Sequence, residues 1–98
     1  MDFLEITSRF ENQLSDEFDF ELLELHYLPY AFGSGTKAYR IKGRNIKIIF
    51  DGRDGLIETE ISLPHEKYKN CNWTSIFNGT TVDFFNKGIE EIKKRMKN

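Results

Sequence analysis

The spacing of apolar residues changes along the chain, from a helical period near both ends to strict alternation in the middle. Near the start, one helical stripe is formed by Phe3, Ile6, Phe10 and Leu14. Asp2 lies just before this stripe and Glu5 three residues later, which is the spacing of an N-terminal capping pair. These patterns predict an N-terminal helix.

A second helix is predicted near the C-terminus. Its apolar stripe consists of Phe85, Ile89, Ile92 and Met96. Thr80 and Asp83 resemble a capping box at its start, and basic residues gather at its end, where they suit the helix dipole.

The middle of the chain alternates apolar and charged residues between glycines, which is typical of strands joined by tight turns. A two-residue turn at Gly43–Arg44 and a four-residue loop from Gly52 to Gly55 can be used to set two registers independently. Both registers place apolar residues in shared rows. This agreement is informative because a slip by one residue would send the apolar residues of one strand to the opposite face. The predicted cross-strand rows are Tyr39–Ile48–Thr59 and Ile41–Ile46–Ile61.

Residues 18–27 fit either a helix or a strand. The strand is preferred because a glycine loop and another strand follow, but it requires a bulge near Leu22 and Leu23. With Gly33–Gly35 as the loop, Pro29 faces Tyr39 and Tyr27 faces Ile41. Proline cannot donate to a strand ladder, which suits an outermost strand.

The chain leaves this sheet at Pro64, and we expect "WTSIF" (residues 73–77) to be irregular. The prediction is therefore a single α+β domain over residues 1–98. Its sheet is a four-stranded antiparallel β-meander packed against an N-terminal and a C-terminal helix.

Composition limits the class of protein. The chain has 98 residues, 39% hydrophobic and 31% charged, with a net charge of -2, which is globular rather than disordered. Cys71 is the single cysteine, and the sequence shows neither a membrane-spanning apolar run nor a signal-peptide pattern. These features favour a cytoplasmic protein.

Candidate chemistry is sparse. "FGSGTK" lacks the spacing of a phosphate-binding loop, and "DGRDG" places Arg53 where a calcium ligand would stand. We therefore predict no cofactor, no metal and no catalytic residue. Two alternatives stay open: a small enzyme that uses the Cys71 and His65 loop, and a nucleic-acid-binding module that uses a basic hairpin. The basic residues of that hairpin are Lys37, Arg40, Lys42, Arg44 and Lys47.

The predicted registers also align apolar residues on the face that should meet water. Tyr30, Ala38 and Ile49 form a row there, with Phe32 and Leu56 near the hairpin ends. Either residues 68–77 cover this patch, or a partner does. The strand from Leu56 to Leu63 is predicted to be an edge at which a partner strand, or a second copy of the chain, could add.

The expected function is protein binding, with acids that select a basic partner, and the expected partner is a protein rather than a nucleic acid or a membrane. The predicted partner-binding residues are Tyr30, Phe32, Ile49, Leu56, Glu58 and Glu60. The stretch "YAFGSGTKAYRIKGRNIKIIFDGRDG", with the strand and helix after it, resembles small bacterial α+β immunity proteins of polymorphic or contact-dependent toxin systems. The resemblance implies that the chain binds and neutralises a cognate toxin domain.

Overall fold

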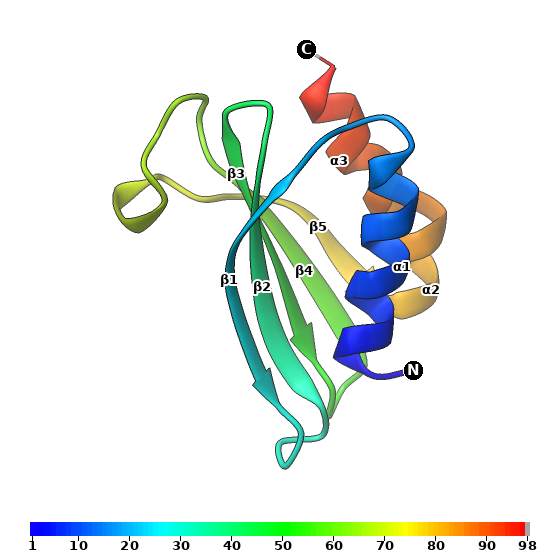
Figure 1. The fold of residues 1–98 in the computed structure, drawn as a ribbon. Coiled ribbons are helices and arrows are strands. Elements are labelled where there is room, and N and C mark those ends of the chain that lie inside the picture. Colours follow the sequence, from blue (N-terminus) through cyan, green and yellow to red (C-terminus); the bar gives the residue numbers. More distant parts are fainter. Residues whose placement is uncertain (98) are drawn as a thin grey trace.

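The computed structural model describes residues 1–97 and contains two helical segments on one face of a five-stranded sheet (Figure 1). The elements are α1 (Phe3–Ser15), β1 (Glu21–Leu28), β2 (Ser34–Ile41), β3 (Arg44–Asp51), β4 (Leu56–Ile61), a short 3-10 turn (Tyr68–Asn70), β5 (Thr74–Thr80), α2 (Thr81–Asp83), a π-helical turn (Phe84–Gly88) and α3 (Ile89–Met96). The strands are all antiparallel and lie in chain order. The predicted α+β class is confirmed, but the sheet has five strands rather than four.

The additional strand is β5, which includes most of the segment expected to be irregular. It pairs with β4 along the register Leu56–Thr80, Ile57–Gly79 and Thr59–Phe77. This segment is short, and its apolar and polar residues do not alternate clearly, so the sequence gives no strand signal. It becomes a strand because the free backbone groups of β4 offer it hydrogen-bond partners. The prediction that residues 56–63 form a free edge is therefore wrong.

The registers were predicted correctly at one hairpin and incorrectly at the next. The β3–β4 pairs Phe50–Ile57, Ile48–Thr59 and Ile46–Ile61 are confirmed. The β2–β3 turn consists of Lys42 and Gly43, with φ angles of 50° and 77°, instead of Gly43 and Arg44. This turn needs positive φ at both positions, and Gly43 has to be the second of them.

The displacement of this turn moves the β2–β3 pairing by two residues. The observed rows are Tyr39–Ile46–Ile61 and Lys37–Ile48–Thr59, so the predicted Tyr39–Ile48 and Ile41–Ile46 pairs are wrong. Because side chains in a strand alternate, a shift by two leaves every residue on its predicted face.

The first hairpin confirms that residues 21–28 form a strand, with the bulge between Leu22 and Glu24. Its loop is longer than predicted, since the last pair is Leu28–Ser34 and Tyr27 faces Gly35. Pro29 and Tyr30 therefore lie in the loop, and the predicted Pro29–Tyr39 and Tyr27–Ile41 pairs are wrong. The cause is that the loop begins at Pro29 and reverses direction at Phe32 and Gly33, which have φ angles of 60° and 70°, so that Ser34 and Gly35 already belong to β2.

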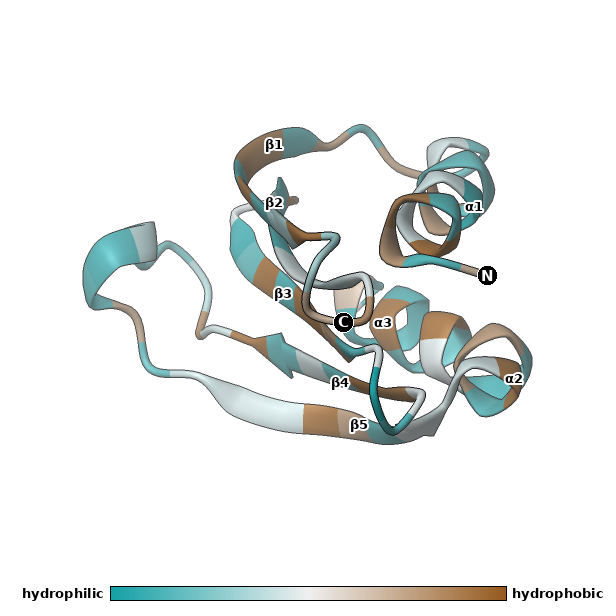
Figure 2. Cartoon of the chain, turned by 90° about the horizontal axis from the view of Figure 1, so that it is seen from below, coloured by the Kyte–Doolittle hydropathy of each residue, from teal (hydrophilic) through white to brown (hydrophobic). Residues whose placement is uncertain are grey.

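The core lies between the sheet and the helices (Figure 2). The whole α1 stripe of Phe3, Ile6, Phe10 and Leu14 is buried, and Asp2 caps α1 by accepting from the amide of Glu5. Phe10 packs edge-on against Tyr39, with ring centroids 5.4 Å apart.

The C-terminal helix begins at the predicted cap, where the amide of Asp83 donates to the hydroxyl of Thr80. Ile89, Ile92 and Met96 are buried as predicted, but Phe84 takes the deepest position in place of Phe85. The π-helical turn at Phe84–Gly88 adds a residue to one turn, which rotates the helix face between Phe84 and Ile89.

Candidate functional site

The sheet face opposite the helices, which we call the outer face, is crossed by regular rows of side chains. One row runs Glu24–Ala38–Lys47–Glu60–Ser75, and the next runs His26–Thr36–Ile49–Glu58–Asn78. The first row lies at the end of the sheet where the β4–β5 connection crosses, and we call this the covered end. The second row lies toward the β1–β2 loop, and we call this the open end.

The covered end is closed by residues 63–73, which we call the cover loop. Glu66 organises this loop, because its carboxylate accepts from the amides of Leu63 and Asn72 and from the side chain of Asn72. The Asn45 side chain donates to the carbonyl of Glu66 at 2.9 Å and ties the loop to β3. Asn45 and Ala38 are completely buried beneath it.

Two aromatic residues of the cover loop lie over the first row. The ring of Trp73 lies 4.3 Å from the ammonium of Lys47, which also lies 3.9 Å from the carboxylate of Glu60. The hydroxyl of Tyr68 donates to Glu24 on β1. Burial, together with this bond to Glu24, raises the pKa of Tyr68 to about 12. The loop thus contacts β1 through Tyr68 and β3 through Glu66 and Trp73.

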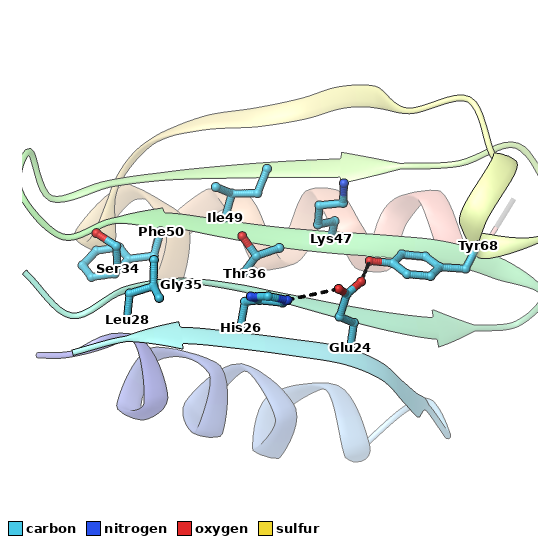
Figure 3. Close-up of a pocket in the computed structure, with 10 residues that line it drawn as sticks. All are labelled: Glu24, His26, Leu28, Ser34, Gly35, Thr36, Lys47, Ile49, Phe50 and Tyr68. Atoms are coloured by element: carbon cyan, nitrogen blue, oxygen red, sulfur yellow. Dashed lines mark hydrogen bonds and ion pairs between the residues drawn. The ribbon is translucent and has the colours of Figure 1, made fainter. Parts of the chain in front are cut away.

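An open groove of about 410 Å³ begins where the cover loop ends (Figure 3). Thr36 and Ile49 stand between Leu28 on one side and Tyr68 with Lys47 on the other. The remaining lining residues are Glu24, His26, Ser34, Gly35 and Phe50. The carboxylate of Glu24 connects the two edges of this groove, because it lies 3.5 Å from the ring of His26 and also accepts from Tyr68.

Beyond the groove, the β1–β2 loop presents two aromatic side chains to solvent. Tyr30 is 85% exposed and Phe32 is 70% exposed. Phe32 has φ of 60°, which is a genuine outlier for a bulky residue. The loop is held by the β3–β4 loop, since a Cβ at Gly52 would lie 1.9 Å from the carbonyl oxygen of Phe32. The amide of Gly52 also donates to the hydroxyl of Ser34 at 2.9 Å.

The structure distributes the six predicted partner-binding residues over four places. Tyr30 and Phe32 lie in the exposed loop, Leu56 is exposed at the start of β4, and Ile49 and Glu58 are neighbours in the second row. Glu60 lies in the first row against Lys47. The predicted Tyr30–Ala38–Ile49 row does not exist, because Ala38 lies between Glu24 and Lys47 and the cover loop buries it.

Glu24, His26, Leu28 and Tyr68 line the groove, but the sequence analysis assigned none of them to a binding site. Glu24, His26 and Leu28 alternate along β1, and this period of two was a usable signal for one strand face. No sequence pattern places Tyr68 at the groove, because its contact with Glu24 joins residues 44 positions apart in the chain.

The two residues of the alternative catalytic loop have different neighbours. The thiol of Cys71 donates to the carbonyl of Tyr68, whereas the ring of His65 lies beside Gly43. Within residues 1–97, no cluster of three His, Cys, Asp or Glu side chains could hold a metal ion.

The basic hairpin does not form one surface. Lys37 lies on the helix side, 2.5 Å from Glu11, while Arg40 and Lys47 lie on the outer face near Glu21 and Glu60. Arg44 donates to the carbonyl of Ser62. The basic side chains therefore lie on two faces of the sheet, and Lys37, Arg40 and Lys47 each lie near a carboxylate. A nucleic acid would need them unpaired on one surface.

Comparison of the chain with protein-family models, with curated proteins and with solved structures finds no match. None of the helices described for residues 1–97 has the length and apolar character needed to cross a membrane.

Proposed function

We propose that this chain functions by binding another protein through the open end of its outer face. The observation that carries the proposal is the pair of exposed aromatic side chains, Tyr30 and Phe32, on a loop that the β3–β4 loop holds in place. Tyrosine and other aromatic residues contribute a large share of the binding energy at protein interfaces. A loop that is already ordered also loses little entropy on binding.

The groove beside this loop supports the proposal. It offers apolar contact from Leu28 and Ile49 together with polar groups, so a side chain of a partner could enter it. Glu58 adjoins Ile49 in the second row, and Glu24 lines the groove. These carboxylates favour a basic partner by charge complementarity.

The backbone of Phe32 gives a second line of support. A non-glycine residue with positive φ costs about 1–2 kcal/mol, and such strain concentrates at functional sites. Asparagine or glycine would relieve the strain at this position but would remove the aromatic ring. A ring retained at this cost is consistent with a contact that the free protein does not make.

The resemblance to immunity proteins suggests a toxin domain as the partner class. In that role the chain would stay in the cytoplasm and cover the functional surface of a basic toxin domain. No catalysis by this chain is required, because occupancy alone blocks the toxin.

The experiment is affinity capture from the native host with three forms of the protein. The wild type is compared with a Tyr30→Ala/Phe32→Asn double variant and with Val82→Ala, which removes an equally exposed apolar side chain from α2. We expect a basic protein to be retained by the wild type and by Val82→Ala and to be lost from the double variant. Coexpression should then relieve the toxicity of that protein's isolated domain.

Retention of the same protein by the double variant would place the interface elsewhere and contradict the proposal. A captured protein that is not toxic would leave protein binding in place but remove the immunity role.

A further inference from the structure

β1 is an outermost strand whose far edge pairs with no strand in the part of the chain that the structure describes. Leucines are unusually exposed along it: Leu22 by 50%, Leu25 by 46% and Leu28 by 38%. Soluble proteins protect such edges with lysine, proline or bulges. Here the bulge at Leu22–Glu24 and Pro29 lie at the two ends, so residues 24–28 stay available.

The side chains of β1 complement a second β1 in one antiparallel register. A two-fold axis through Leu25 places Leu25 opposite its own copy, Glu24 opposite His26 of the second copy, and His26 opposite Glu24 of the second copy. Glu24 and His26 both lie on the outer face, so each pair joins an acid with a basic side chain on the same face.

Neighbouring registers lack this complementarity. An axis through Glu24 sets two carboxylates against each other, and an axis through His26 sets two imidazoles against each other. An axis between two residues would pair outer-face with helix-face side chains, which breaks the alternation of the sheet. The other edge, β5, carries no charged residue between Thr74 and Thr80 that could specify a register.

We infer that β1 pairs antiparallel with β1 of a second copy of this chain, with Leu25 on the two-fold axis, to form a continuous ten-stranded sheet. Isologous pairing of this kind closes after two copies and uses the free ladder groups of both edges. The grooves of the two copies adjoin across the axis, because Glu24, His26 and Leu28 line both the groove and the paired edge. The inference rests on the free edge of β1 rather than on the Tyr30 and Phe32 loop, and it does not depend on the proposed partner, whose groove the paired edges adjoin.

Disulfide cross-linking tests the register directly. Residues directly opposite in an antiparallel pair have Cα atoms about 4.5–5.5 Å apart, which is within the range of a disulfide. In a Cys71→Ser background, Leu25→Cys should therefore form a covalent dimer under mild oxidation at micromolar concentration. Leu22→Cys is the matched control, since it is equally exposed but lies six residues, about 20 Å, from its own copy along the paired strands.

Cross-linking of Leu25→Cys alone supports the inference. Equal cross-linking of both variants, or of neither, overturns it.

A charge test measures the same pairing without a new thiol. His26→Glu places two carboxylates opposite each other at both symmetric positions, and His26→Lys preserves the opposite charges. Sedimentation equilibrium should show a dimer dissociation constant raised about fivefold or more in His26→Glu, from the cross-strand pair energies, and unchanged or lower in His26→Lys. Equal effects of the two variants, or a wild type that stays monomeric at millimolar concentration, would contradict the inference.

Discussion

The covered and open ends of the outer face are formed by the same strands, but side chains at the covered end are bonded within the protein, whereas those at the open end face solvent. At the covered end, Asn45 is buried and bonded to Glu66, and Lys47 lies between Trp73 and Glu60. At the open end, Tyr30 and Phe32 face solvent, and Phe32 holds a costly backbone conformation. Substitutions at the covered end should therefore change stability, whereas those at the open end should change binding.

The largest expected effect is that of Asn45→Ala at the covered end. The variant removes the buried Asn45 side chain, leaves the carbonyl of Glu66 without its donor and opens a small cavity, so the free energy of unfolding should fall by about 1–3 kcal/mol. Thr36→Ala, one row away in the open groove, is the matched control and should change it by less than about 0.5 kcal/mol. Urea unfolding measures both, and similar losses would remove the distinction between the two ends.

Tyr68→Phe should cost less, about 0.5–1.5 kcal/mol at neutral pH, because the hydrogen bond to Glu24 is only partly shielded from water. The folded pKa of Tyr68 is raised to about 12, so the neutral hydroxyl stabilises the fold below pH 10 and this contribution is lost as pH rises through about 12. Absorbance titration at 295 nm should show a tyrosine step near pH 12 that is missing from Tyr68→Phe. The same step in the variant would disprove the assignment.

Phe32→Asn should have the smallest effect on stability and the opposite sign. Asparagine tolerates positive φ, so the free energy of unfolding should stay unchanged or rise by up to about 1 kcal/mol. Partner capture should weaken in the same variant, because the exposed ring is gone. A clear loss of stability would show that Phe32 supports the fold, and the loop would no longer be evidence for an interface.

The site was only partly accessible to sequence reasoning, and the particular residues explain why. Ile49 and Glu58 were placed correctly on the outer face because alternation assigns strand residues to faces, whereas Tyr30 was predicted in a strand and lies in the loop. The predicted row through Tyr30 was wrong, because the β1–β2 loop is longer than its glycines suggest. Tyr68 could not be found, since its contact with Glu24 depends on the path of a loop without periodicity.

The sequence by itself determined the N-terminal helix stripe, the C-terminal stripe except for Phe85, the N-caps at Asp2 and Thr80, the β1 bulge and the faces of the residues in β2, β3 and β4. These features depend on neighbours a few positions apart, where the geometry of helices and strands is fixed. Only the tertiary structure decided that Thr74–Thr80 is a strand, that β5 rather than β4 is the second edge of the sheet, and that the cover loop closes one end of the outer face. Those outcomes depend on contacts such as Asn45 with Glu66 and Tyr68 with Glu24, which form between distant parts of the chain once the sheet offers unpaired groups and space.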